Sequence, residues 1–390
     1  MHIYSNKLLT MNITAYKNKV LGSMIGGAIG DALGYPVEFM SYSQIIHKYG
    51  PSGITRYHLN TDGVAEISDD TQMSLYTANG ILYNKTLNAI GLQEKMTDTI
   101  CEAYIAWFNT QTELYPYNMK HCFWISNVKE LYARRAPGVA CMSALRSLQQ
   151  DYAVVNDSKG CGGIMRVAPV ALYACNPMDT YYSLSDTHSY AKEAGDVAAL
   201  THKNPLGYIP AAFLYLLLES ILPYSYLYPL QLYRIVDSCV INLEKIYPDH
   251  PSELYDLEQL IAKAKELALC ADNDQEAIMQ LGEGWTADEA LAIALYCSLK
   301  YYDDFEKAII AAVNHSGDSD STGAITGNIM GALHGYEAIP YYYKQDLELR
   351  WLIEALAIDL ANDVPAAVDD DIEDTPEKKA WRRKYLNAEL

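Results

Sequence analysis

The sequence predicts an all-α protein. Apolar residues recur three and four positions apart along most of the chain, which is the spacing that places them on one face of a helix. Strand-like alternation is scarce, and residues 53–59 are its one weak candidate. Half of the 390 residues are hydrophobic, so the chain can bury a sizeable core.

Ten segments carry the helical spacing: 16–33, 71–83, 95–108, 190–200, 211–221, 254–271, 287–299, 305–313, 323–333 and 347–360. The stretches between them are rich in turn residues, and none is long enough to be an interdomain linker. We therefore predict one domain over residues 14–364. Residues 365–390 add an acidic run and a last charged helix, which follows Thr375 as N-cap and Pro376 at the first helical position. We interpret this last helix, over 378–389, as a solvated appendage.

The chain carries 29 basic and 49 acidic residues, for a formal net charge of −20. A surface this acidic repels phosphate backbones, which argues against a nucleic-acid partner. Eight scattered cysteines without a C-x-x-C pair predict free buried thiols in a reducing compartment. Residues 1–14 lack the apolar core of a signal peptide, and the longest apolar stretch, 211–218, is shorter than the roughly 18 residues of a membrane span. We expect a cytoplasmic protein without a membrane partner.

Two of the predicted helices carry glycine at every fourth position. The first stripe is Gly22, Gly26, Gly30 and Gly34, and the second is Gly323, Gly327, Gly331 and Gly335. Each glycine inside a helix costs about 1 kcal/mol relative to alanine, so the stripes carry a large penalty. A helix face without side chains lets another backbone approach closely. We hypothesise that the two helices pack on each other or on a shared neighbour, although the stripes alone favour core packing without a functional role.

Acidic residues cluster at two predicted helix starts. Ser68, Asp69 and Asp70 precede an apolar-periodic segment, and alone they are typical of an ordinary helix cap. Asp318, Asp320 and Ser321 open the second glycine helix. This second cluster resembles the start of an EF-hand loop, but position 12 would be Ile329 instead of glutamate, so a calcium loop is rejected. Together the clusters offer six oxygen side chains and no cysteine, a set that suits two Mg²⁺ or Mn²⁺ ions rather than zinc.

Two further features are candidates for substrate contact. Residues 159–166 form a glycine-rich loop whose backbone N–H groups and Arg166 could hold phosphates, although an ordinary tight turn explains the loop equally well. The loop matches neither a Walker loop nor a dinucleotide-binding fingerprint. His202 follows a predicted helix, where a histidine commonly only meets the last carbonyl groups.

Taken together, these segments resemble the ADP-ribosylglycohydrolase family. The matching stretches occur in the family's order over about residues 17–363 and are 22–40, 67–75, 135–138, 160–170, 200–205, 282–296 and 314–335. The resemblance implies an orthogonal multi-helix bundle with a two-metal cleft. It also implies hydrolysis of the glycosidic bond between ADP-ribose and an acceptor on a protein or a small conjugate.

Carried over by position, the resemblance implies a role for each candidate residue. The metal ligands would be Ser68, Asp69, Asp70, Asp318, Asp320 and Ser321, with two Mg²⁺ or Mn²⁺ ions. Glu38, together with Asp69 and Asp70, would serve catalysis. The substrate-binding residues would be Gly160, Cys161, Gly162, Gly163, Met165, Arg166 and His202. Ser68 and Ser321 stand where the family often has threonine and keep the hydroxyl group.

The mechanistic hypothesis follows from the same resemblance. The metals would bind the 2″- and 3″-hydroxyls of the distal ribose and a bridging water, and attack at C1″ would expel the acceptor. The motifs look most similar to the bacterial branch that acts on ADP-ribosyl-arginine. Serine-linked or other conjugates, an immunity role against a toxin ADP-ribosyltransferase, and a two-metal nucleotide phosphohydrolase remain alternatives. We expect a monomer or a small homo-oligomer.

Overall fold

The computed structural model describes residues 13–117, 123–176, 184–362 and 375–389. Within these ranges the chain forms α-helices joined by loops and short 3₁₀ turns. Two isolated bridges, Ala65 with Leu347 and Gly160 with Thr286, are the only β-type pairings in the described residues. The predicted all-α class is therefore confirmed, and the weak strand candidate at 53–59 is not a strand.

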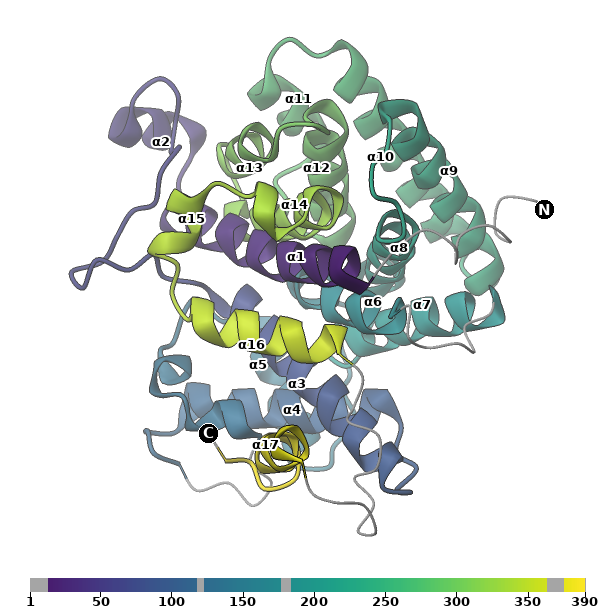
Figure 1. Ribbon diagram of the computed structural model, residues 1–390. Helices are drawn as coiled ribbons and strands as arrows, with labels where there is room; N and C mark the ends of the chain where they lie inside the picture. The colour runs from purple at the N-terminus through teal and green to yellow at the C-terminus, as the bar shows by residue number, and fades with distance from the viewer. Residues whose placement is uncertain (1–12, 118–122, 177–183, 363–374, 390) are drawn as a thin grey trace.

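Figure 1 labels the helices in chain order. They are α1 (Ile13–Gly34), α2 (Tyr42–Tyr49), α3 (Asp69–Ala89), α4 (Met96–Thr112), α5 (Val139–Gln149), α6 (Ala168–Ala174), α7 (Leu184–Ala199), α8 (Pro205–Ile221), α9 (Pro229–Ile246), α10 (Pro251–Cys270), α11 (Asp274–Leu281), α12 (Ala287–Lys300), α13 (Phe305–Val313), α14 (Ser319–His334), α15 (Tyr341–Gln345), α16 (Arg350–Ala361) and α17 (Pro376–Tyr385). All ten predicted segments lie on helices. The helices without a prediction are α2, α5, α6, α9, α11 and α15, and most of these are short.

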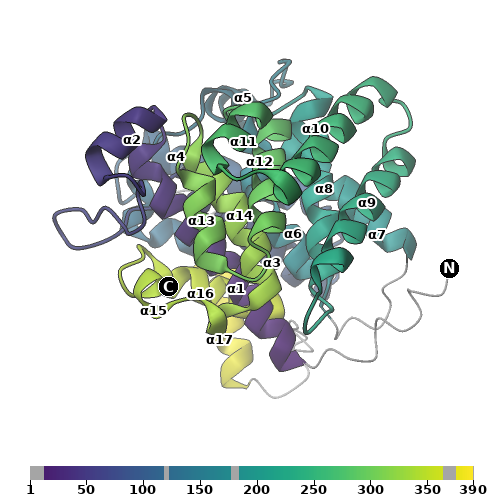
Figure 2. The same ribbon diagram turned by 90° about the horizontal axis from the view of Figure 1, so that it is seen from above.

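The centre of the molecule is the antiparallel pair α1 and α14, which lie side by side in both views (Figures 1 and 2). A Cβ atom added to Gly22, Gly26 or Gly30 would overlap the backbone carbonyl groups of the opposite stripe. Ser23 and Asn328 lock the pair further, because each side chain hydrogen-bonds to the other residue's carbonyl oxygen at 2.9 Å. The hypothesis was that the two glycine helices pack on each other or on a shared neighbour, and the first of these alternatives is confirmed.

Two groups of helices flank this central pair (Figure 1). On one side, α16 leads to α3, α4 and α17, and on the other side lie α8 to α13. Residues 211–218 of α8 are all buried, which explains the longest apolar stretch of the sequence as core. No helix in the described part of the chain is long and apolar enough to span a membrane.

The last helix is not the solvated appendage that we predicted. Trp381 and Tyr385 of α17 are buried, and the Trp381 indole donates a hydrogen bond to the Thr86 hydroxyl of α3 at 2.8 Å. The Tyr385 hydroxyl donates to the Asp359 carboxylate of α16 at 2.6 Å. Apolar burial on one face therefore outweighs the solvation of the basic face. The acidic run at 369–374 lies outside the described residues.

Candidate active site

Three chain segments meet where α1 ends and where α3 and α14 begin. Gly34 closes α1 directly against the backbone of Ser319 and Asp320, where a Cβ atom would not fit. A single 3₁₀ turn, Tyr35–Val37, then brings Glu38 to the same point. The close packing of the glycine stripes thus places an acid from the start of the chain beside acids that lie about 280 positions later.

Asp31 ties the start of α3 to α1. Its buried carboxylate accepts hydrogen bonds from the backbone N–H of Ser68 at 3.0 Å, from that of Thr71 at 3.1 Å, and from the Thr71 hydroxyl. Burial raises the pKa of Asp31 to about 6, although these hydrogen bonds lower it. Asp31 directly follows Gly30 of the first glycine stripe but is not among the predicted site residues. A charged residue on the closely packed face of a helix was the available signal.

The first turn of α3 presents Asp69 and Asp70. Ser68 is the N-cap, as its position predicted, and its hydroxyl accepts a hydrogen bond from the Asp70 N–H at 3.2 Å. Two hydrogen bonds join Asp69 to the loop before α5. Its N–H donates to the Arg135 carbonyl at 3.1 Å, and its carboxylate accepts from the Gly138 N–H at 3.3 Å. Ser68 therefore caps α3, and the same first turn also presents two acids to the site.

The first turn of α14 presents Asp318 and Asp320. Asp318 is the N-cap, and its carboxylate accepts from the Ser321 N–H at 3.3 Å. The Asp318 N–H donates to the Glu283 carbonyl at 2.8 Å. Gly317 precedes this turn with φ +127°, a conformation that side-chain-bearing residues rarely adopt, and a Cβ atom there would overlap Glu283. The loop before α12 therefore fixes where α14 begins.

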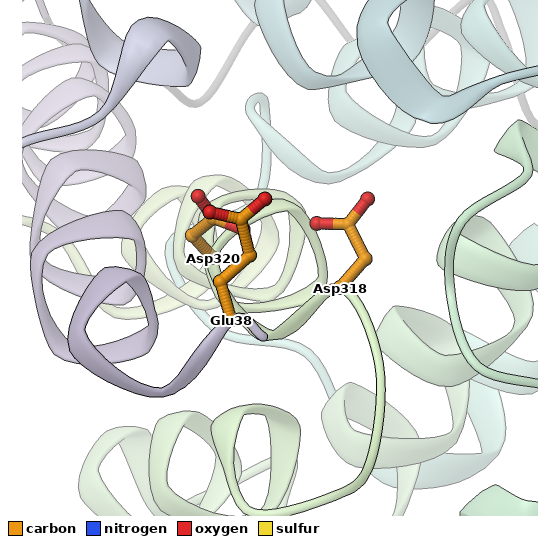
Figure 3. Close-up of side chains that lie close together, drawn as sticks. All are labelled: Glu38, Asp318 and Asp320. Atoms are coloured by element: carbon orange, nitrogen blue, oxygen red, sulfur yellow. The ribbon is translucent and has the colours of Figure 1, made fainter. Parts of the chain in front are cut away.

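Glu38, Asp318 and Asp320 form the tightest acidic group in the described residues. Each offers one carboxylate oxygen, and these three atoms lie within 4.8 Å of one another (Figure 3). All three side chains are buried. Oε2 of Glu38 and Oδ2 of the neighbouring Asp70 have no hydrogen-bond partner among the described residues. Buried, unpaired carboxylate oxygens are costly, and a divalent cation is the partner that would satisfy them.

Four acids of this site resist ionisation. Burial, followed by the charges of Asp318, Asp69 and Asp31, raises the pKa of Glu38 to about 9. Burial also raises the pKa of Asp69 to about 8, and it holds the pKa values of Asp70 and Asp320 well above the usual range. So many carboxylates cannot all carry charge in one buried space unless cations neutralise them.

The acids lie in a cleft of about 190 Å³. The predicted site residues that line it are Glu38, Asp69, Asp70, Gly160, Cys161, Gly162, Met165, His202, Asp318, Asp320 and Ser321. Ser68, Gly163 and Arg166 are not among the lining residues. Ala136, Gly138 and Trp285 also line the cleft. The structure therefore brings most of the predicted site together, from five separate stretches of the chain.

The glycine-rich loop forms a 3₁₀ turn, Cys161–Arg166, in the wall of the cleft. Its start pairs with the loop before α12, because the Cys161 N–H donates to the Trp285 carbonyl at 3.1 Å. A Cβ atom on Gly162 would press on the His202 ring and on the Cys141 sulfur. Gly163 instead packs against Ala198 and Gly207, so its lack of a side chain serves helix packing.

Arg166 does not face the cleft, which argues against the predicted contact with phosphates. Its fully buried guanidinium group donates to the Thr201 hydroxyl at 2.6 Å and lies 4.3 Å from the centre of the Tyr104 ring. The same Thr201 oxygen is 2.8 Å from Nδ1 of His202. Arg166 thus positions His202 through Thr201. Burial and the Arg166 charge lower the pKa of His202 to about 3, so the ring in the cleft wall is neutral.

An aromatic pair stands at the rim. The rings of Phe39 and Trp285 stack with centroids 5.8 Å apart and planes inclined by 20°. Phe39 is 73% exposed and Trp285 is 38% exposed, so the stacked pair presents an aromatic surface to solvent. Phe39 directly follows Glu38, so the pair borders the acidic group. Contacts of this kind depend on the fold and leave no spacing pattern in the sequence.

Comparison with known proteins gives one consistent result. The family model described as ADP-ribosylglycohydrolase matches residues 12–369. The chain is similar to ADP-ribosylhydrolase ARH3 of Mus musculus, with 26% identity over 49% of this chain and 53% of that protein. It is also similar to the ADP-ribosyl-[dinitrogen reductase] glycohydrolase of Rhodospirillum rubrum, with 23% identity over 85% of this chain and 91% of that protein. A solved structure described as an ADP-ribosylglycohydrolase-related protein complex superposes with a TM-score of 0.58 and 22% identity, covering 89% of this chain and 98% of that one.

Proposed function

Because this chain belongs to the ADP-ribosylglycohydrolase family, whose members are hydrolases of ADP-ribose conjugates, we propose that it releases ADP-ribose from arginine on a protein with the help of divalent cations. The observation that carries the proposal is the buried group of Glu38, Asp318 and Asp320 at the base of a cleft. The other site residues make this cleft suitable for a ribose.

The residues of the cleft fit Mg²⁺ or Mn²⁺. Their donor atoms are carboxylate and hydroxyl oxygens, which these hard cations prefer. The proposed ligands of two such ions are Ser68, Asp69, Asp70, Asp318, Asp320 and Ser321, of which Ser68 already accepts the Asp70 N–H. When bound, the ions supply positive charge that orients ribose hydroxyls and makes a water molecule more acidic.

The chain's own residues then position the substrate and move protons. Oε2 of Glu38 makes no hydrogen bond to the described residues, and Glu38 lines the cleft, so this oxygen is available to exchange a proton with a water or with the leaving acceptor. The backbone of the glycine-rich turn offers N–H groups to the diphosphate. His202, neutral and buried in the wall, offers a hydrogen bond without a competing positive charge.

The size of the cleft limits what enters it. Pockets that enclose a drug-sized ligand measure about 300–1,000 Å³, and this cleft is smaller. It therefore takes the ribose end of the substrate, and the adenosine end lies outside, where the Phe39–Trp285 pair offers an exposed aromatic surface. This arrangement favours cleavage next to the ribose over attack on the diphosphate by a nucleotide phosphohydrolase.

Charge supports arginine as the acceptor. The chain has a net charge of −20, so its surface attracts a cationic guanidinium group, whereas a serine oxygen gains nothing from that charge. The preference for arginine over serine is the most specific part of the proposal. A cytoplasmic location and a monomer or small homo-oligomer also belong to it, together with ADP-ribosylated proteins as partners.

The test compares two substrates under three conditions. Arginine- and serine-modified proteins are incubated side by side with Mg²⁺, with Mn²⁺ or with EDTA, and the products are separated. We expect ADP-ribose from the arginine substrate, no release in EDTA, and a loss of about 100-fold or more in Asp318→Ala. Full release in EDTA contradicts the metal role, faster release from serine contradicts the acceptor, and AMP as the product supports the phosphohydrolase instead.

A further inference from the structure

Two thiols line the acidic cleft, those of Cys141 and Cys161, and Cys161 contacts one of its acids. Sγ of Cys161 is 2.6 Å from Oδ2 of Asp318, and the Ser321 hydroxyl donates to this sulfur at 3.6 Å. Asp318 belongs to the group whose oxygens converge within 4.8 Å. A cation bound to Asp318 at an ordinary metal–oxygen distance of about 2.0–2.6 Å would therefore also be within reach of the sulfur.

A second observation points to a cation here independently of the thiol. Oδ2 of Asp70 and Oε2 of Glu38 have no hydrogen-bond partner among the described residues, and both side chains are more than nine-tenths buried. Both residues line the same cleft as Cys161. Unpaired buried oxygens beside a thiol form a mixed donor set of sulfur and oxygen atoms.

Sulfur changes which cation such a set prefers. Carboxylates and hydroxyls suit Mg²⁺ and Mn²⁺, whereas a thiolate selects softer ions such as Zn²⁺ and Cd²⁺. We propose that Cys161, with Asp318 and Asp70, gives this cleft a binding position for a thiophilic divalent cation that competes with Mg²⁺. The thiol gives up its proton as it takes the cation, and that proton leaves to solvent. This inference rests on the metal centre of the proposed function.

The neighbouring thiol does not share this property. Sγ of Cys141 lies 3.4 Å from the Arg166 guanidinium group, whose positive charge repels a cation. Cys270, which is exposed on α10, offers a matched control. Cys161 is thus the one described thiol in contact with a carboxylate of the acidic group.

The experiment uses the full chain and Cd²⁺ as the probe. Cadmium bound to a thiolate gives an ultraviolet charge-transfer band, which is titrated in the wild type, in Cys161→Ser and in Cys270→Ser. We expect Cys161→Ser to lose the band and to weaken Cd²⁺ binding by about tenfold or more, while Cys270→Ser keeps both. Because the thiolate prefers Cd²⁺, competing Mg²⁺ should shift the midpoint of the wild-type titration to higher Cd²⁺ concentration without abolishing the band.

Each outcome decides the matter. An unchanged band in Cys161→Ser overturns the proposal, and so does a wild-type Cd²⁺ titration midpoint that saturating Mg²⁺ leaves unchanged. The second measurement needs no variant, so it decides even if Cys161→Ser does not fold. The titration contains no ADP-ribose conjugate: release of ADP-ribose with Mg²⁺ but no band refutes this inference alone, and a Mg²⁺-sensitive band without any release refutes the hydrolase proposal alone.

Discussion

The two halves of the acidic cleft are held in place by different forces. Asp318 and Asp320 stand where they do because α1 and α14 touch backbone to backbone through paired glycines. Asp69 and Asp70 stand where they do because hydrogen bonds to Asp31 and to the loop before α5 hold the start of α3. Backbone contact tolerates no added atom, whereas a hydrogen-bonded junction can be weakened one donor at a time. We therefore expect the first half to fail abruptly on substitution and the second half gradually.

The largest loss of stability should come from adding one methyl group to a glycine in the interface between α1 and α14. In an open helix, glycine to alanine stabilises by about 1 kcal/mol. In Gly327→Ala the new Cβ atom would overlap the carbonyl group of Gly26, which cannot move aside. We expect the free energy of unfolding, measured with urea, to fall by about 2–3 kcal/mol. Gly91→Ala is the control, because nothing lies within 4 Å of it and only its φ of +85° is unfavourable, at about 1 kcal/mol. A Gly327→Ala protein as stable as the wild type would refute the packing argument.

The next effect concerns the pH dependence of stability, because both halves of the cleft contain buried acids. The pKa values of about 9 for Glu38 and about 8 for Asp69 are raised, so the folded chain keeps protons that the unfolded chain loses above about pH 4. Without cations, stability therefore falls as the pH rises from about 4 towards 9. Mg²⁺ binds the ionised form and stabilises by about 2.7 kcal/mol at one hundred times its Kd.

Thermal melting can check both statements. In EDTA the melting temperature should fall between pH 5 and pH 8, and saturating Mg²⁺ should raise it more at pH 8 than at pH 5. Glu38→Gln should flatten the pH dependence in EDTA because it removes one of the groups that titrate. An equal Mg²⁺ effect at both pH values would show that the acids do not hold the ions.

The third effect belongs to the hydrogen-bonded half. Asp31→Asn keeps the shape of the side chain but turns one acceptor into a donor, which faces the N–H groups of Ser68 and Thr71. An unsatisfied buried donor costs about 1–3 kcal/mol, and removal of a buried charge offsets part of this. We expect a net loss of about 1–2 kcal/mol, with faster hydrogen exchange at the start of α3. Thr71→Val, which removes only the hydroxyl contact, should lose less. Equal exchange in Asp31→Asn and the wild type would mean that α3 is held by something else.

The same contrast explains what the sequence could predict. The glycine stripes repeat at the period of a helix, so spacing alone predicted that α1 and α14 pack closely on each other or on a shared neighbour, and the structure shows that they pack on each other. Acids beside each stripe then gave a reason for distant carboxylates to meet. Glu38 could be assigned only by resemblance, because no spacing rule connects it to Asp318.

The remaining contacts depend on side chains that meet only in the folded chain. Arg166 looked like a phosphate ligand because it ends a glycine-rich loop, yet Tyr104 of α4 and Thr201 after α7 enclose it. The last helix looked solvated because its basic residues outnumber its apolar ones. In the structure, however, the Trp381 indole hydrogen-bonds to the Thr86 hydroxyl of α3. Local patterns give periodicity and caps, but they carry no information about which distant side chain fills a given space.

The smallest effect tests whether Ser68 acts as a cap or as a ligand. Its hydroxyl accepts the Asp70 N–H, and loss of an N-cap costs about 1 kcal/mol. Ser68→Ala should therefore destabilise by that amount in either case. If Ser68 also holds a cation, calorimetry should show Mg²⁺ binding weakened by about tenfold. Thr375→Ala is the matched control, since it removes the cap of α17 far from the acids and should leave Mg²⁺ affinity unchanged. Equal Mg²⁺ affinity in both variants would mean that Ser68 only caps α3. The α3 half of the cleft would then contribute to the metal centre only through Asp69 and Asp70.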